Sequence, residues 1–270
     1  VGGMRPKELT IIGARPGMGK TAFAGHLTLM AAKQGYRVGL FSMEMAGDAI
    51  ALRLLTATAF DQGHPIAYEA FRKGTAKAHE QDALFAAEGA ISQLPIDVHE
   101  GRGLSPSGML MAAKRQQHAY ALTKYPLGLI IVDHLQKIRP DRDCRGNKVA
   151  EMTEISDALQ KMAGQLNIPI VALSQLNRAV EGRNDRKPEL SDLRESGSIE
   201  QDADTVLMLY RHAYYVKKKE PAQGSPEHNE WYAEWTACKH KLDVHVTKNR
   251  NGSEGRCTVY FDAPSSALKD

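Results

Sequence analysis

Cysteine is scarce in this chain of 270 residues, since only Cys144, Cys238 and Cys257 occur, far apart in the sequence. An odd, scattered set excludes the disulfide framework of a small secreted domain and is typical of reduced thiols in a cytoplasmic protein. Cys238 and Cys257 could be combined with His240 and His245 into a zinc cluster. Their spacing matches no common zinc ligand pair, so the sequence disfavours a metal site there.

Long hydrophobic runs and net charge are also lacking. No apolar run approaches the about 20 residues that cross a membrane, and no signal-peptide core opens the chain, so we expect no membrane partner. The net charge is only +3, and no basic field over the whole molecule indicates nucleic acid. Contact with nucleic acid would therefore depend on a few placed residues, repeated by oligomerisation.

The rest of the composition fits one large globular domain covering residues 1–270, with 42% hydrophobic and 25% charged residues. Short apolar runs alternate with helical patterns, which predicts an α/β fold with a mostly parallel central sheet flanked by helices. Strands are predicted at residues 9–13, 37–42, 95–98, 127–133, 168–174 and 205–210. Helices are predicted from about residues 19 and 47 and over residues 105–122 and 148–166.

The last third of the chain has a different character. Residues 243–248 and 256–262 alternate apolar and polar positions on either side of an Asn-Gly turn signal, which predicts a C-terminal antiparallel hairpin. Two segments, 177–198 and 212–240, show little apolar periodicity and are predicted as loops. The second is long and lysine-rich, and a loop of that length in a compact domain is ordinarily functional or disordered.

A phosphate-binding loop is predicted between the first strand and the first helix, where residues 13–21 read Gly-Ala-Arg-Pro-Gly-Met-Gly-Lys-Thr. Glycines allow backbone N–H groups to converge on an anion, and the N-terminus of the following helix adds its dipole and free donors. Lys20 would reach the β- and γ-phosphates, and the Thr21 hydroxyl would ligate Mg²⁺. The usual pattern has glycine where this chain has Ala14, with Gly13 one place early. The alternative is a glycine-rich turn that binds nothing, which the strand–loop–helix context disfavours.

Three polar residues at the ends of predicted strands are candidates for the chemistry of hydrolysis. Asp133 ends the most hydrophobic run, where a second acid that holds Mg²⁺ belongs. Glu44 follows the second strand and could orient or deprotonate water at the carboxyl edge of the sheet. Gln175 comes just after another buried run and could sense a γ-phosphate. Each also has a plainer interpretation as a polar residue at a strand end.

Together these motifs resemble one family, the DnaB-type replicative DNA helicases, which are P-loop ATPases with a RecA-like core. The family's variant Walker A, which lacks the first glycine, is similar to Ala14, Arg15, Pro16, Gly17, Met18, Gly19, Lys20 and Thr21. The resemblance implies that all eight residues bind the nucleotide, ATP. It also implies Mg²⁺ as the cofactor, held by Thr21 and Asp133.

Three more stretches carry the resemblance to the catalytic motifs. Phe41-Ser42-Met43-Glu44-Met45 resembles the motif whose glutamate activates water, which implies that role for Glu44. Ile131-Val132-Asp133-His134-Leu135-Gln136 resembles the Walker B strand, with His134 where tyrosine is expected. Ala172-Leu173-Ser174-Gln175-Leu176-Asn177-Arg178 is similar to the sensor motif, which implies that Gln175 senses the γ-phosphate.

The most specific resemblance is the string over residues 192–204, which includes Arg194-Glu195-Ser196-Gly197. In the family this turn faces the central channel, so the resemblance implies that Arg194, Glu195 and Gly197 contact single-stranded DNA. The alternative is a capped loop that leads into a helix. Residues 247–252 are similar to the hairpin that reaches a neighbouring nucleotide, which implies that Arg250 is an arginine finger and Lys248 its partner. A finger supplied by a neighbouring subunit can be worth roughly 10³–10⁵ in rate.

The resemblance covers nearly the whole chain and implies a homohexamer that translocates 5′ to 3′ on single-stranded DNA and unwinds duplex. It further implies a primase and a helicase loader as partners of the full-length protein. The family also has an N-terminal helical domain and a linker helix, neither of which is found in this sequence, so we expect an isolated motor domain. The segment 212–240 is the clearest departure, because it is longer and richer in lysine than the family needs.

Two other classes of protein are compatible with parts of the pattern. A RecA-type recombinase or a clock-type ATPase would share the core fold but should lack the string over residues 192–204. A helicase loader or other binding module could keep the nucleotide only as a switch, with negligible hydrolysis. The combination of Glu44, Asp133, Gln175 and Arg250 favours turnover.

Overall fold

The computed structural model describes residues 3–101 and 103–269, with the side chains of residues 194–198 left out. Nine strands in this part of the chain form one sheet: β1 (Leu9–Ala14), β2 (Arg37–Ser42), β3 (Ile96–Glu100), β4 (Leu127–Asp133), β5 (Ile170–Gln175), β6 (Thr205–Tyr210), β7 (Lys241–Asn249), β8 (Gly255–Asp262) and β9 (Ala267–Lys269). Their order across the sheet is β3-β2-β4-β5-β1-β6-β7-β8-β9. The first six strands pair in parallel, and β7, β8 and β9 continue the sheet antiparallel.

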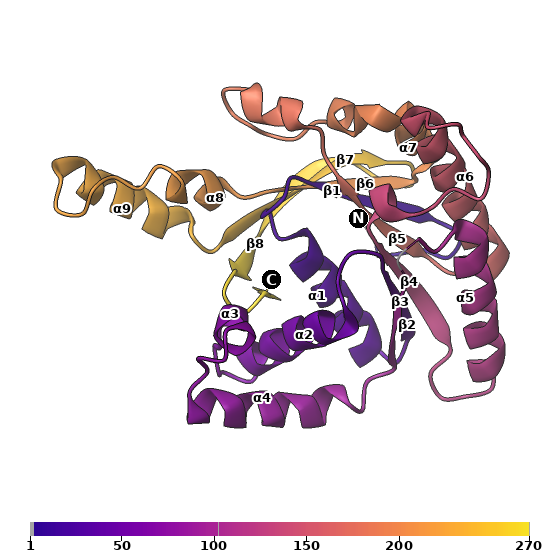
Figure 1. The fold of residues 1–270 in the computed structure, drawn as a ribbon, viewed down its shortest axis with the longest axis horizontal. Helices are drawn as coiled ribbons and strands as arrows, with labels where there is room; N and C mark the ends of the chain where they lie inside the picture. Colours follow the sequence, from indigo (N-terminus) through magenta and orange to yellow (C-terminus); the bar gives the residue numbers. More distant parts are fainter. Residues whose placement is uncertain (1–2, 102, 270) are drawn as a thin grey trace.

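Helices cover both faces of the sheet (Figure 1). They are α1 (Lys20–Lys33), α2 (Gly47–Asp61), α3 (Tyr68–Arg72), α4 (Ala78–Ile91), α5 (Pro106–Tyr120), α6 (Lys148–Leu166), α7 (Gly197–Asp202), α8 (His212–Lys217) and α9 (Pro226–Cys238). Short 3₁₀ turns are η1 (Leu135–Lys137), η2 (Arg178–Gly182) and η3 (Leu190–Ser196). One core cluster joins α5, α6 and α7 to the sheet, and a second joins α1 and α2 to the opposite face.

The predicted α/β class and the mostly parallel sheet are confirmed. Every residue of β1 and β6 is buried, as expected for parallel strands with helices on both faces. The predicted C-terminal hairpin is also confirmed, because β7 and β8 pair antiparallel from Lys241 with Tyr260 to Val246 with Gly255. The three-residue strand β9 was not predicted, since a strand that short carries no periodicity of its own.

The prediction of a long loop over residues 212–240 is wrong, because α8 and α9 fill most of this segment. Ser225 caps α9 by accepting a hydrogen bond from the His228 backbone N–H, and Pro226 occupies its first turn. The Trp231 indole donates to the Val216 carbonyl oxygen at 2.8 Å and ties α9 to α8. Pro226 therefore starts a helix, and the two helices extend from the body as an arm (Figure 1).

The segment 177–198, also predicted as a loop, is irregular but contains η2, η3 and the start of α7. Asp192 is buried and orders this segment, because it accepts a hydrogen bond from the Glu189 backbone N–H at 2.7 Å and pairs with Arg183. The predicted DNA contacts Arg194, Glu195 and Gly197 lie in it, and the side chains of Arg194 and Glu195 are outside the described part of the structure.

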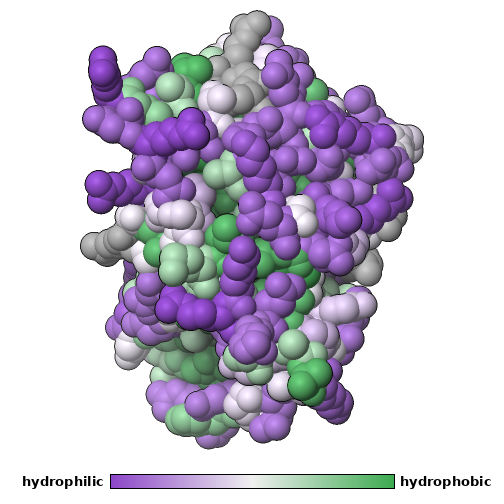
Figure 2. Space-filling view, turned by 90° about the vertical axis from the view of Figure 1, so that its right-hand side faces the viewer, coloured by the Kyte–Doolittle hydropathy of each residue, from purple (hydrophilic) through white to green (hydrophobic). Residues whose placement is uncertain are grey.

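The surface over α5 and α6 is mainly hydrophilic, with apolar side chains gathered near its middle (Figure 2). Met111 on α5 and Val149 on α6 are 63% and 54% exposed. No helix in the described ranges is long and apolar enough to cross a membrane.

Candidate functional site

The loop that joins β1 to α1 has the backbone geometry of an anion cradle. Gly17 and Gly19 have φ values of 81° and 92°, a left-handed conformation that favours glycine. Gly19 is the N-cap of α1, and no side chain caps this helix end. The free backbone donors and the positive end of the dipole therefore remain for a ligand, as an anion site requires.

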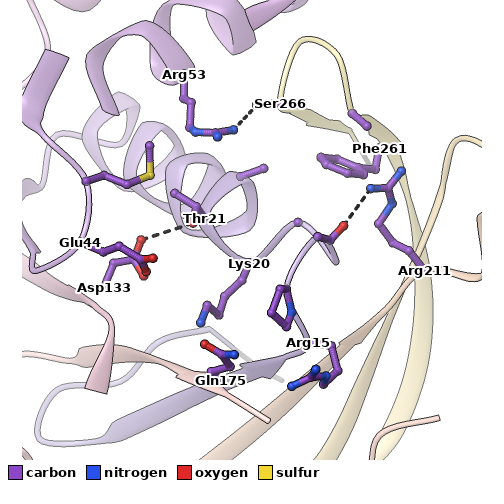
Figure 3. A pocket seen from close by; sticks show the side chains of 16 residues that line it. Arg15, Lys20, Thr21, Glu44, Arg53, Asp133, Gln175, Arg211, Phe261 and Ser266 are labelled. Atoms are coloured by element: carbon purple, nitrogen blue, oxygen red, sulfur yellow. Dashed lines mark hydrogen bonds between the residues drawn. The ribbon is translucent and has the colours of Figure 1, made fainter. Parts of the chain in front are cut away.

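Lys20 and Asp133 face each other across this cradle, in a pocket of about 400 Å³ (Figure 3). Burial lowers the pKa of Lys20, although the carboxylates of Asp133 and Glu44 oppose the effect. Burial also raises the pKa of Asp133, and the Lys20 ammonium opposes that shift most. Both charges are thus incompletely compensated, so an anion beside Lys20 and a cation beside Asp133 would stabilise the site.

Three more predicted residues reach the same pocket. The Thr21 hydroxyl lies 3.3 Å from Asp133 Oδ2, which brings together a hydroxyl and a carboxylate suited to a hard cation. Glu44 and Gln175 also line the pocket, at the carboxyl ends of β2 and β5. Strand topology explains this convergence, because parallel strands β2, β4, β5 and β1 end at one edge of the sheet. The arrangement can bind a polyphosphate, a cation and a water molecule beside a carboxylate.

The eight residues predicted to bind nucleotide do not all face the pocket. Ala14 and Met18 are buried in the core and do not line it. Arg15 lines the pocket, but its guanidinium donates to the Leu176 carbonyl oxygen at 2.8 Å and pairs with Glu181 at 2.9 Å. Its side chain therefore braces the loop against η2 and the end of β5.

Several pocket residues were missed by sequence reasoning, among them Arg53, Arg211 and Phe261. The Arg211 guanidinium stacks 4.5 Å over the Phe261 ring and donates to the Gly17 carbonyl oxygen at 3.3 Å. Arg53 donates to the Ser266 hydroxyl at 3.1 Å. Arg211 directly follows β6, so the rule that sites form at carboxyl ends of strands could have found it. Arg53 and Phe261 arrive by long-range packing and carry no comparable signal.

Lys248 and Arg250 lie outside this pocket. Arg250 pairs with Asp204 at 3.0 Å and donates to the Gln201 carbonyl oxygen, while Lys248 donates to the Glu200 carbonyl oxygen. Asn249 pairs with Thr205 at the amino end of β6, whereas the phosphate-binding loop follows Ala14, which pairs with Leu209 near the carboxyl end. Four residue steps along a strand separate the two ends by roughly 13 Å.

The described residues contain no group of three or more His, Cys, Asp or Glu side chains that could hold a metal ion. A cation at Thr21 and Asp133 would complete its coordination with water and ligand oxygens, which is the ordinary situation for Mg²⁺.

Comparisons with known proteins identify the family of this chain. The model of the DnaB-like helicase C-terminal domain matches residues 1–270. The replicative DNA helicase DnaB of Rickettsia felis is 38% identical over 275 residues, which cover 98% of this chain and 53% of that protein. The replicative DNA helicase DnaC of Bacillus subtilis is 34% identical over 260 residues, which cover 96% of this chain and 51% of that protein.

Two solved structures have the same fold. A DnaB-like replicative helicase, described with its interactions with primase, matches with a TM-score of 0.82 and 29% identity over 98% of this chain and 58% of that one. A second structure, described as an ATPase domain, matches with a TM-score of 0.80 and 29% identity over 98% of this chain and 84% of that one. The chain spans about half the length of the curated relatives it matches. It belongs to the family of the DnaB-like helicase C-terminal domain.

Proposed function

We propose that this chain is the ATP-hydrolysing motor of a cytoplasmic replicative DNA helicase. The observation that carries the proposal is the convergence of Lys20, Thr21, Asp133, Glu44 and Gln175 on one pocket. Membership of the family and relatives named replicative DNA helicases support it. The partners proposed with it are single-stranded DNA, further copies of the chain, a helicase loader and a primase. A structural neighbour described with primase supports the last of these.

The pocket suggests how ATP would lie. The backbone of the loop after β1 would hold the phosphates, and Lys20 would contact the β- and γ-phosphates. Across the loop from Asp133 and Glu44, Arg211 and Phe261 form a flat, partly charged surface (Figure 3). A base would stack there, because aromatic and guanidinium planes both bind π-systems. Arg15 and Met18 would contribute by shaping the loop.

Thr21 and Asp133 fit Mg²⁺, which when bound supplies charge neutralisation on the β- and γ-phosphate oxygens. Thr21 would bind the ion through its hydroxyl, and Asp133 would hold it through water. Glu44 would accept a proton from the attacking water, since a carboxylate positioned beside the water acts as general base. Gln175 would donate its side-chain amide to the γ-phosphate and so distinguish ATP from ADP.

A ring explains why Lys248 and Arg250 lie at the edge of the sheet opposite their own pocket. We propose a homohexamer in which these residues reach the nucleotide of the neighbouring subunit, with Arg250 as the finger. Hydrolysis would then change how adjacent subunits sit. That change would move Arg194, Glu195 and Gly197 along one DNA strand, 5′ to 3′, by contacts with the backbone rather than the bases.

ATP hydrolysis, measured with and without single-stranded DNA, tests the proposal. It is the primary measurement because the chain spans about half of its relatives' length. Lys20→Ala should abolish hydrolysis, since Lys20 is the only lysine among the described residues that line the pocket. Lys161→Ala on the exposed face of α6 is the matched control and should hydrolyse ATP like the wild type.

Displacement of a strand from a forked duplex with a 5′ tail is the second measurement. Hydrolysis by Lys20→Ala at the wild-type rate would refute the assigned site. ATP binding by the wild-type chain without any turnover would favour a nucleotide-switched binding module instead.

A further inference from the structure

We propose that His134 and Gln136 are positioning residues that tie Glu44 to the backbone of Gln175. The inference rests on the proposed function, because it takes Glu44 as the base and Gln175 as the sensor of the γ-phosphate. Both positioning residues lie in the short turn after β4, and Gln136 is the middle residue of η1. This turn lies between the ends of β2 and β5, because β4 pairs with both strands.

Gln136 is fixed by two hydrogen bonds to the same residue. Its Oε1 accepts from the Gln175 backbone N–H at 3.1 Å, and its Nε2 donates to the Gln175 carbonyl oxygen at 3.1 Å. Nε2 also donates to the Ser174 hydroxyl at 3.0 Å. A backbone N–H can only donate and a carbonyl can only accept, so the orientation of the Gln136 amide is determined.

This orientation also determines how His134 is bonded. His134 Nδ1 lies 2.9 Å from Gln136 Oε1, and an amide oxygen can only accept, so Nδ1 carries a proton. On the other side of the ring, Nε2 lies 2.8 Å from Glu44 Oε2, and because a carboxylate oxygen accepts, Nε2 is the donor of this contact. The imidazole thus joins a side chain on the loop after β2 to an amide held at the end of β5.

The two ends of this bridge differ in exposure. The His134 side chain is only 5% exposed, whereas the Glu44 side chain is 58% exposed. An exposed glutamate on a loop ordinarily samples many rotamers, and an oriented carboxylate needs a partner that is itself held in place. Buried His134, bonded through both ring nitrogens, is such a partner. With Oε2 held by His134, Oε1 of Glu44 remains for a water molecule at the pocket.

The bridge gives the site a coupling that neither residue has alone. Gln136 is hydrogen-bonded to the backbone of Gln175. A γ-phosphate that orders the Gln175 side chain therefore also orders the peptide to which Gln136 is bonded. Through His134 the same order reaches Glu44. We infer that the bridge holds the base in line with the sensor, so that its loss lowers kcat and leaves ATP binding largely intact.

Steady-state hydrolysis by variants of the whole chain tests the inference, with kcat and KM determined separately. His134→Asn can keep a donor near the position of Nδ1 but loses Glu44, whereas His134→Gln can place a donor near the position of Nε2 and keep Glu44. We expect kcat to fall about 10- to 100-fold for His134→Asn and for Gln136→Leu, as for other residues that orient a reacting group. His134→Gln should recover a substantial part of the loss. The KM for ATP should change by less than about threefold.

The control is His118→Gln on the exposed surface of α5, which should match the wild type. A double variant, Glu44→Gln with His134→Asn, should be no slower than Glu44→Gln alone, because His134 acts through Glu44. The inference is overturned if kcat is unchanged in His134→Asn, if KM rises while kcat stays constant, or if the two losses multiply. A wild-type chain that binds ATP without turnover would contradict the proposed function itself. Thermal unfolding of each variant identifies any that fails to fold. If Gln136→Leu fails to fold, the comparison of His134→Asn with His134→Gln carries the test.

Discussion

Gly13 and Ala14, the last two residues of β1, have different roles although both are small. A Cβ on Gly13 would lie 2.6 Å from Met208 Sδ and 2.9 Å from Leu176 Cδ2, so these two buried side chains would have to shift to admit one. Ala14 already carries a Cβ, is fully buried and packs in the core with α1. The glycine that appears one place early in the phosphate-binding loop is therefore required by packing against β6, not by phosphate.

Two single variants, Gly13→Ala and Ala14→Gly, test this interpretation. Gly13→Ala should reduce the free energy of unfolding by about 1–3 kcal/mol, as overpacking of a core does. Ala14→Gly should cost about 0.5–1 kcal/mol, because glycine loses more backbone entropy on folding. Urea denaturation measures both, and ATP affinity should survive in Ala14→Gly. A Gly13→Ala variant as stable as the wild type would contradict the packing role.

At the level of single residues, the sequence predicts those site residues whose positions are determined by a local motif. Lys20, Thr21 and Asp133 could be named because loop spacing and strand ends place them, and the structure brings them into one pocket. The side-chain direction of Arg15 could not, since it depends on Glu181, 166 residues away in the chain. Phe261 was missed for the same reason, because β8 reaches the phosphate-binding loop only through pairing along the sheet.

At the level of elements, the hairpin of β7 and β8 is attached to the end of α7. Lys248 and Arg250 donate to the carbonyl oxygens of Glu200 and Gln201, which belong to the last turn of that helix. Cations at this position satisfy free carbonyls and oppose the negative end of the helix dipole. Because α7 continues directly from η3, the proposed finger and the proposed DNA-contacting turn are mechanically connected.

Arg250→Ala should therefore loosen α7 within its own subunit. Amide hydrogen exchange over residues 199–203 is the measurement, and it should be faster in Arg250→Ala than in the wild type. Arg256→Ala, on the exposed strand β8, is the control and should leave this segment unchanged. Equal protection in Arg250→Ala and the wild type would show that the contact with Gln201 and Asp204 does not hold the helix.

The arm of α8 and α9 shows why composition alone failed for residues 212–240. The helical periodicity of α9 is weak, because its buried side is made of Trp231 and Trp235 packed on α8 rather than on the sheet. These two indole rings stack with centroids 5.9 Å apart. A segment that packs on a single short helix buries too narrow a stripe to give an amphipathic pattern, so its lysine-rich composition decided the prediction.

At the scale of the whole molecule, the candidate residues form two groups that lie at opposite edges of one sheet. The pocket lies at the carboxyl ends of the parallel strands, and the hairpin that carries Arg250 turns at their amino ends. The predicted fold class could not reveal this separation, because it depends on the register of β7 against β6. A rigid sheet keeps the pocket and Arg250 apart within a subunit, so the proposed finger could reach a nucleotide only in a second copy.

Mixing two inactive variants tests this arrangement. Lys20→Ala and Arg250→Ala should each hydrolyse ATP far more slowly than the wild type when pure. In an equal mixture, about one quarter of the interfaces would combine an intact Lys20 with an intact Arg250, so hydrolysis should recover toward that fraction of the wild-type rate. Light scattering coupled to size exclusion establishes that the subunits assemble. The double variant mixed with Lys20→Ala cannot form an intact interface and should stay inactive, whereas co-assembled single variants without recovery would show that Arg250 acts within its own subunit.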